Sequence, residues 1–173
     1  MGGENTELRE QFVALYDAHA GRLLSFAFYR VHERTLAEDI TADAFVKLWQ
    51  RMQSGVQIEN ARALLYTITR GMIIDQYRKQ SIRQVVPIES ELDALRVEET
   101  IVNELDAKRD YAIVAKAVSS LKAEYADIII LYYLQELPIT EIAHILGLTE
   151  NNARVRVHRA LTALREQLHY VRQ

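Results

Sequence analysis

Proline and glycine are scarce in this chain, and their scarcity limits it to folds made of long uninterrupted segments. The 173 residues include 2 prolines, Pro87 and Pro138, and 6 glycines. An all-β sandwich needs turn residues between many short strands, so this spacing favours helices. About half of the residues, 49%, are apolar, which is enough to bury a core in one ordinary domain or two small helical ones. The predicted fold class is therefore all-α.

Several classes of protein are excluded by features that the sequence lacks. It contains no cysteine, which rules out disulfide frameworks, thiolate zinc sites and cysteine nucleophiles. The longest apolar run, Ile128–Leu134, is far shorter than the roughly 20 residues of a membrane span. The first nine residues are polar and acidic and lack the apolar core of a secretory signal. We therefore expect a soluble, cytoplasmic protein with no membrane insertion.

The sequence also lacks a catalytic constellation. Its five histidines do not have the spacing of metal ligands, and it has no glycine-rich phosphate loop. We expect no catalytic residue, no metal, no cofactor and no enzymatic activity.

Apolar residues at helical spacing predict three helices in the N-terminal half. The first helix covers about residues 6–29, and its apolar face contains Leu8, Phe12, Leu15, Tyr16, His19, Leu23 and Phe26. Thr35 and Glu38 have the spacing of a capping box, which predicts a second helix from there to about Met52. Asn60 is a candidate N-cap for a third helix that ends near Gln80.

The pattern changes after this third helix. Residues 81–103 contain a proline and a cluster of acids, and we interpret them as a linker. Helicity resumes near Glu104, and further helices are predicted at about 122–135, at 139–146 and from Thr149 to Tyr170. The sequence therefore predicts two small helical bundles, at 6–80 and 104–170, joined by an acidic linker.

The net charge of −3 is distributed unevenly along the chain. Residues 1–80 are neutral, residues 81–118 carry −3, residues 119–149 carry −3, and residues 150–173 carry +3. A protein that binds nucleic acid over its whole surface is basic overall. This chain is predicted to bind nucleic acid only through a local patch, with its acidic part facing other partners.

The most informative segment, residues 139–160, has the pattern of a helix-turn-helix. A small residue, Ala143, stands where two helices cross closely, and Gly147, four positions later, can adopt the positive φ of the turn. Thr149 is placed to cap the second helix. With Ala153 and Val157 turned inward, six residues of that helix are expected to point outward or to flank the groove side: Asn151, Asn152, Arg154, Val155, His158 and Arg159. Arginine and asparagine are the residue types that contact guanine and adenine edges, and arginines also hold phosphates. The alternative is an ordinary helical hairpin with a solvated basic face.

With these residues identified, the chain resembles a bacterial RNA polymerase sigma factor of the small, two-domain extracytoplasmic-function (ECF) group of the sigma-70 family. The resemblance covers about residues 8–168. In the C-terminal bundle it rests on Glu141-Ile-Ala, Leu146-Gly-Leu-Thr and the segment Arg154–Ala160. It implies that the second helix of the motif lies in the major groove of the minus-thirty-five promoter element. The implied DNA-facing residues are Asn151, Asn152, Arg154, Val155, Arg156, His158 and Arg159. The family often has Gly-Thr in place of Asn151-Asn152 and Ser in place of Val155.

In the N-terminal bundle, the segment Ala37–Trp49 resembles the family's signature for binding the clamp coiled coil of the polymerase largest subunit. Asp39, Asp43 and Lys47 are the implied polymerase-binding residues, and helical spacing puts Asp43 on one exposed face with each of the other two. The alternative is an amphipathic helix with a charged outer face. For Trp49 itself, a place in the core is favoured.

The segment Ala61–Lys79 resembles the element that melts and captures the minus-ten promoter sequence. Opening a duplex requires stacking partners for extruded bases and cations along the single strand. The implied residues are Arg62, Tyr66, Arg70, Gly71, Tyr77, Arg78 and Lys79. Leu64 stands where the family usually has Trp, and Gly71 where it usually has Asn. For Tyr66, a place in the core is the alternative.

The resemblance implies a transcription initiation factor that directs core RNA polymerase to promoter DNA, is a monomer when free, and is held inactive by an anti-sigma factor. It also implies that the acidic linker threads toward the polymerase active-site cleft; a solvated connector is the alternative. Two other functions remain open. A stand-alone helix-turn-helix regulator would dimerise on palindromic half-sites. A helical adaptor that binds only protein would not need the arginines of the last helix.

Overall fold

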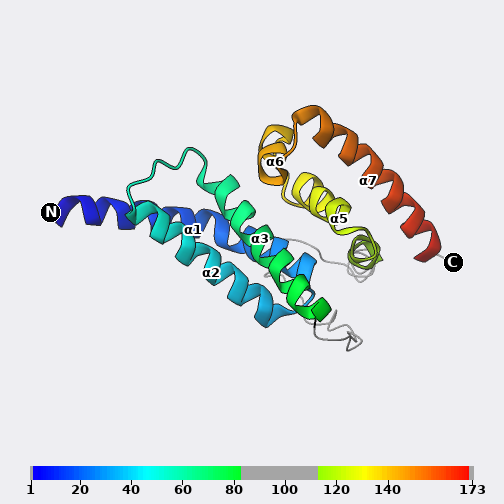
Figure 1. Ribbon diagram of the computed structural model, residues 1–173, viewed down its shortest axis with the longest axis horizontal. Coiled ribbons are helices and arrows are strands. Elements are labelled where there is room, and N and C mark those ends of the chain that lie inside the picture. Colours follow the sequence, from blue (N-terminus) through cyan, green and yellow to red (C-terminus); the bar gives the residue numbers. More distant parts are fainter. Residues whose placement is uncertain (1, 83–112, 172–173) are drawn as a thin grey trace, which may run out of the picture. The chain divides into compact units, whose positions relative to one another are not determined.

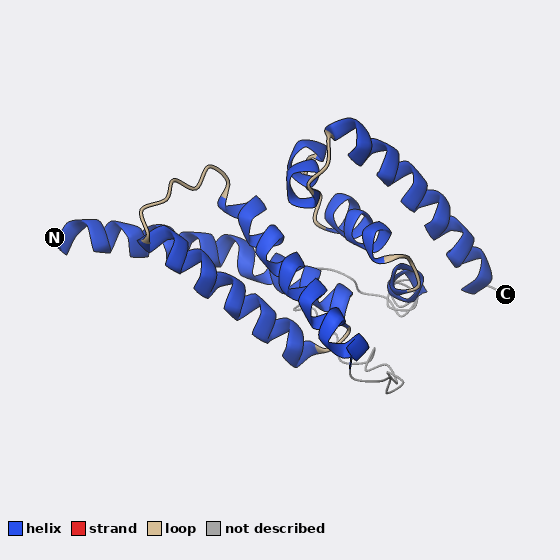
Figure 2. Cartoon of the chain, viewed as in Figure 1, coloured by secondary structure: helices blue, strands red, loops and turns tan. Residues whose placement is uncertain are grey.

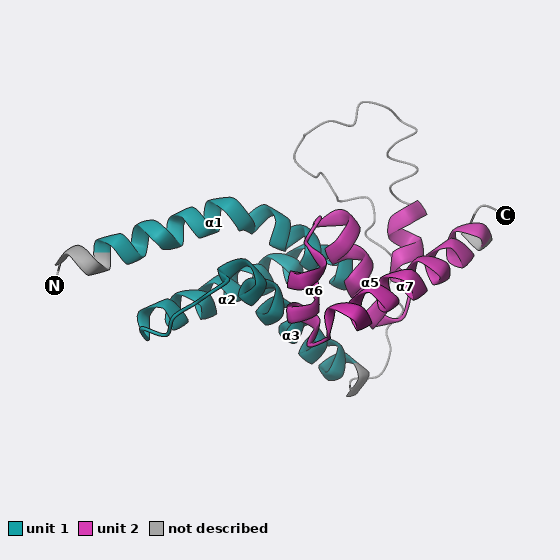
Figure 3. Ribbon diagram, turned by 90° about the horizontal axis from the view of Figure 1, so that it is seen from above, with its two compact units in different colours: residues 1–87 teal, residues 88–173 magenta. Residues whose placement is uncertain are grey.

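The computed structural model describes residues 2–82 and 113–171, with side chains described for residues 6–80 and 113–169. Every regular element in these residues is helical (Figures 1 and 2). The chain divides into two compact units, residues 1–87 and 88–173 (Figure 3). The predicted linker, 81–103, begins inside the last helix of unit 1, and its remainder lies outside the described residues. The predicted restart of helicity at Glu104 lies outside them as well.

Unit 1 is a bundle of three helices that pack pairwise against one another: α1 (Gly2–Val31), α2 (Arg34–Gln53) and α3 (Ala61–Ile82). The three predicted helices are confirmed, and α1 is longer than predicted at both ends. The core is filled by apolar side chains from all three helices, and the largest of those that are completely buried are Leu23, Phe26, Leu48, Leu65 and Ile73. Burying such side chains contributes roughly 1.5–3 kcal/mol each to the stability of the bundle.

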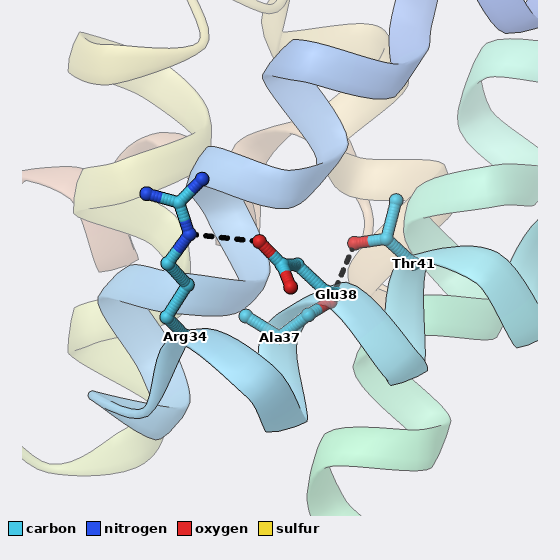
Figure 4. A network of polar contacts seen from close by, with 4 residues as sticks. All are labelled: Arg34, Ala37, Glu38 and Thr41. Atoms are coloured by element: carbon cyan, nitrogen blue, oxygen red, sulfur yellow. Dashed lines mark hydrogen bonds and ion pairs between the residues drawn. The ribbon is translucent and has the colours of Figure 1, made fainter. Parts of the chain in front are cut away.

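The start of α2 corrects one prediction. Glu33 occupies the N-cap position without a side-chain capping hydrogen bond, and α2 already begins at Arg34. Thr35 therefore lies inside the first turn and cannot act as the N-cap, so the predicted capping box is wrong. Figure 4 shows that Glu38 instead accepts a hydrogen bond from the Arg34 guanidinium, with 2.8 Å between Nε and Oε1. One turn later the hydroxyl of Thr41 donates to the carbonyl of Ala37 at 2.7 Å.

The corner between α1 and α2 is formed by His32. It adopts φ 56°, in the left-handed region that non-glycine residues rarely occupy, and its N–H donates to the Phe28 carbonyl at 2.8 Å. Burial, and secondarily the positive charge of Arg30, lower the pKa of His32 below its usual range. The imidazole is therefore held in its neutral form more strongly than in the unfolded chain.

The start of α3 agrees with the sequence prediction. The side-chain oxygen Oδ1 of Asn60 accepts a hydrogen bond from the Ala63 N–H at 2.9 Å, as an N-cap does.

Unit 2 contains a helical segment at 113–119 followed by α5 (Ala123–Ile129), the π-helical turn η2 (Ile130–Leu134), α6 (Ile139–Leu146) and α7 (Glu150–Val171). The predicted helix at 122–135 is thus an α-helix that widens in its last turn. The N–H of Gln135 donates to the carbonyl of Ile130, five residues earlier, at 2.9 Å. The core of this unit contains Val118, Ile128, Ile130, Leu131 and Ile142, each 1% exposed or less.

No helix in the described residues combines the length and the apolar character that a membrane crossing requires.

Candidate nucleic-acid interface

The segment from α6 to α7 has the geometry of a helix-turn-helix. Gly147 ends α6 in the left-handed conformation, at φ 64° and ψ 38°. The N–H of Leu148 then donates to the carbonyl of Ala143 at 2.8 Å, which closes the turn. Thr149 caps α7, because its hydroxyl oxygen accepts from the Asn152 N–H at 3.2 Å. Both the predicted turn and the predicted cap are confirmed.

Small buried side chains fix which face of α7 points outward. Ala153 and Ala160 are fully buried, and Ala143 of α6 is 4% exposed, so the two helices can approach closely. The opposite face of α7 is exposed and carries most of the predicted DNA-facing residues: Asn151, Asn152, Arg154, Val155, His158 and Arg159. The partial positive charge at the start of α7 lies next to the two asparagines.

Two arginines of this helix are engaged in ion pairs within unit 2. Nη2 of Arg154 lies 3.0 Å from Oε2 of Glu150, one turn earlier on the exposed face. Nη2 of Arg156 lies 3.7 Å from Oε2 of Glu124 on α5, and the Arg156 side chain is only 27% exposed. Arg156 therefore differs from the other predicted DNA-facing residues, because it is directed toward its own unit.

The predicted polymerase-binding residues Asp39, Asp43 and Lys47 are all exposed on α2. Beside them, α1 and α2 together line an open apolar groove with a volume of about 740 Å³. Its aromatic lining comes from both helices and consists of Phe12, Tyr16, Phe45 and Trp49. Trp49 is half-buried and packs on Phe12 with 5.1 Å between ring centroids, so the tryptophan borders the groove rather than filling the core.

Helical spacing placed Phe12 and Tyr16 on the apolar face of the first helix, but it did not reveal this groove. In the structure Val13 is 54% exposed, Tyr16 is 48% exposed, and Val46 of α2 is 52% exposed. The signal that could have revealed the groove is a pair of aromatic residues one turn apart on each helix.

The predicted minus-ten residues on α3 fall into three groups. Tyr66 is 2% exposed and packs edge-to-face on Phe26 at 5.4 Å, so the structure places this ring in the core. Arg62 and Arg70 are half-buried. The other four residues are exposed: Gly71, Tyr77, Arg78 and Lys79.

Tyr77 also has a structural contact that its sequence position does not reveal. Its hydroxyl donates to the carbonyl of Arg30 near the end of α1, and the Arg30 guanidinium lies 5.7 Å from the centre of the Tyr77 ring. The ring therefore ties the last turns of α3 to the corner between α1 and α2.

Comparison with known proteins identifies the family. The sigma-70 region 2 family matches residues 15–82, and the sigma-70 region 4 family matches residues 111–164. The ECF RNA polymerase sigma factor SigL of Mycobacterium tuberculosis is 33% identical over 153 residues, which cover 88% of this chain and 85% of that protein. The chain belongs to the ECF sigma factors of the sigma-70 family.

Another curated relative and two solved structures are also similar to this chain. The ECF RNA polymerase sigma factor SigX of Bacillus subtilis is 25% identical over 96% of this chain and 88% of its own length. The fold is that of the sigma factor RpoE solved with the anti-sigma factor NepR from Bartonella quintana. That match has a TM-score of 0.68 and 24% identity and covers 94% of this chain and 97% of that one. CnrH, solved with the cytosolic domain of CnrY, matches with a TM-score of 0.70 and 22% identity over 94% of this chain and 90% of that one.

Family membership establishes what the chain does in general terms. It is a sigma factor that directs RNA polymerase to promoters. Its N-terminal helices form the region 2 domain, and its C-terminal helices form the region 4 helix-turn-helix domain. Sigma factors are not enzymes, which agrees with the lack of a catalytic constellation in the sequence.

Proposed function

We propose that α7 reads the minus-thirty-five element from the major groove. The supporting observation is that six of the seven predicted residues are exposed on α7, on the face opposite its buried alanines. The turn at Gly147 and the cap at Thr149 hold this helix in place. Asparagine and arginine can make paired hydrogen bonds to adenine and guanine edges there. Arg159 lies at the side of this face and is suited to a phosphate contact.

On α2, the proposed contact to the clamp coiled coil of the polymerase largest subunit uses Asp39, Asp43 and Lys47. Val46 is exposed and follows Asp43 by three residues, so the helix offers one apolar and three charged side chains on neighbouring positions. A mixed surface of this kind beside an apolar groove is typical of a protein interface rather than of a nucleic-acid interface.

On α3, the proposed contact to the melted minus-ten element uses the groups that remain accessible. Arg78 and Lys79 supply charge for the single strand, and the half-exposed ring of Tyr77 supplies a stacking surface. Arg62 and Arg70 contribute from their half-buried positions, and Gly71 lets a strand approach the backbone. Tyr66 is left out of this contact because its ring is buried.

Further partners and states are proposed from the family. The relative RpoE was solved with an anti-sigma factor, and we propose that this chain also has one. We further propose a free chain that is monomeric and cytoplasmic. Its net charge of −3 disfavours tight binding to DNA without polymerase, because phosphate contacts dominate non-specific affinity.

The test is transcription in vitro with core RNA polymerase and a randomised promoter library. We expect selection of promoters with two defined elements and no selection without polymerase. Selective binding of palindromic half-sites by the free chain would instead indicate a stand-alone regulator.

The polymerase contact is tested separately by pull-down of core polymerase. The double variant Asp39→Asn, Asp43→Asn is expected to lose binding. The matched control Glu10→Gln, Asp17→Asn removes the same charge from exposed positions of α1 and is expected to bind normally. Equal binding by both double variants would reject the proposed α2 contact.

A further inference from the structure

Val155 is an unusual residue for its position in unit 2. Within the described part of α7, which ends at His169, every other exposed position carries a polar or charged side chain. Val155 is 41% exposed. Valine is also a poorer helix former than alanine because its branched Cβ restricts the side chain. Neither helix stability nor solvation therefore accounts for a valine at this position.

The place of Val155 on the helix is central to the outward face. It follows the buried Ala153 by two residues and precedes the buried Ala160 by five. At 3.6 residues per turn these steps are rotations of roughly 200° and roughly 140°, so Val155 points almost directly away from the packed side of α7. Asn151 and His158 lie one turn before and after it on the same stripe.

The chemistry of a major groove limits what such a side chain can contact. Base edges in the groove present hydrogen-bond donors and acceptors, and the one apolar group among them is the C5-methyl of thymine. The stiff χ1 of valine holds its two methyl groups in a fixed position, which suits a contact with a single methyl group. The neighbouring asparagines are suited to adenine, the partner of thymine.

We propose that Val155 is a specificity-determining residue that recognises the C5-methyl of one thymine in the minus-thirty-five element. This inference rests on the proposed docking of α7 in the major groove and adds the base that the centre of the helix selects. The group that Val155 would recognise is the methyl group at the 5-position of a pyrimidine, which an A·T pair exposes in the major groove.

The test uses holoenzyme assembled from the full chain and core polymerase, and duplex promoters selected from the randomised library. Each thymine of the upstream element, on either strand, is replaced one at a time by deoxyuridine, which removes only the methyl group. For the wild-type chain we expect one such replacement to weaken promoter binding roughly fourfold, the effect of one buried methyl group. Every other replacement is expected to change affinity much less.

The variant Val155→Ser should bind the thymine and deoxyuridine duplexes equally. Val155→Thr keeps the branched shape and one methyl group and should retain part of the discrimination. Val114→Ser makes the same change at another exposed valine of unit 2, outside α7, and should discriminate like the wild type. Because Val155 is exposed, circular dichroism should show unchanged folding for both of its variants.

Three results would overturn the proposal. The selected element contains no A·T pair, the affinity of the wild-type chain does not change on any deoxyuridine replacement, or the replacement weakens binding by Val155→Ser as much as binding by the wild type. Equal losses would mean that the methyl acts through DNA shape or another residue. Failure of the underlying docking gives a different result. In that case the double variant Arg154→Ala, Arg159→Ala would bind the promoter as tightly as the wild type.

Discussion

The turn of the helix-turn-helix provides a quantitative test of how backbone conformation stabilises this protein. Gly147 has φ 64°, and a Cβ added at that position would meet no atom within 4 Å. Gly71, in the interior of α3, also has open space around an added Cβ, but its backbone is helical. Replacing each glycine by alanine therefore isolates the effect of φ from the effect of packing.

The expected changes in the free energy of unfolding have opposite signs. The left-handed conformation destabilises an L-residue in the folded state by roughly 1–2 kcal/mol. Alanine also restricts the unfolded chain, which stabilises the folded protein by about 0.4–1 kcal/mol and offsets part of that cost. Gly147→Ala should therefore destabilise the protein by about 1 kcal/mol. Gly71→Ala should stabilise it by about 1 kcal/mol, because alanine is the better helix former.

Urea unfolding followed by far-UV circular dichroism measures both variants. Trp49, the one tryptophan of the chain, lies in unit 1 and follows the Gly71→Ala variant separately by fluorescence. A neutral or stabilising Gly147→Ala would show that the turn does not require its left-handed residue. Destabilisation by both variants would show that lost space rather than φ governs these positions.

Three further predictions follow from single contacts. Thr69 is fully buried, and its hydroxyl oxygen has no hydrogen-bond partner among the described residues. Thr69→Val should therefore raise the stability of unit 1 by about 1 kcal/mol in a tryptophan-fluorescence urea titration, and a loss of stability would mean that the hydroxyl is satisfied. Because the pKa of His32 is lowered in the folded protein, the unfolded chain takes up a proton first as the pH falls. The contribution of His32 to stability should therefore be complete above the ordinary histidine pKa and decline below it. His32→Asn should remove this pH dependence of stability, and its persistence in the variant would assign the effect to another group. The ion pair between the half-buried Arg156 and the exposed Glu124 should hold α7 on α5. Arg156→Gln and Glu124→Gln should therefore lower thermal stability by similar, non-additive amounts, whereas additive losses would mean that the two residues do not interact.

Much of the fold could be predicted because the decisive signals are local. Helix α6 begins and ends at the predicted residues because Pro138 favours a helix start and Gly147 supplies the left-handed end. The caps formed by Asn60 and Thr149 also depend on residues three positions away at most. Each of these features is determined by neighbouring residues, so sequence spacing is sufficient to find it.

The features that were missed depend on contacts between distant parts of the chain. Tyr66 and Tyr77 have the same side chain and lie eleven residues apart on one helix. Packing against Phe26 buries Tyr66, whereas Tyr77 is 39% exposed. Arg156 belongs to the DNA-facing set that the family resemblance implies, but it follows the buried Ala153 by three residues and precedes the buried Ala160 by four, which puts it near the packed side of α7. Its approach to Glu124, on another helix, agrees with that orientation. A residue type in a motif therefore indicates what chemistry is available, whereas tertiary packing decides which side chains remain free to use it.

The charge distribution suits the proposed role of α7 in selecting a DNA sequence better than a role in binding DNA tightly. Residues 150–173 carry a net charge of +3, but Glu150 and Glu124 already engage two of the arginines. Each phosphate contact contributes a slope of about −0.9 to the dependence of log affinity on log salt, so few contacts give weak, weakly salt-dependent binding. In the proposed complex, uncharged groups such as Asn151, Asn152 and Val155 would add discrimination between bases without adding general affinity for phosphates. Under this proposal affinity comes from a second attachment, because linking two weak contacts through one polymerase would raise the effective concentration of each at its promoter element.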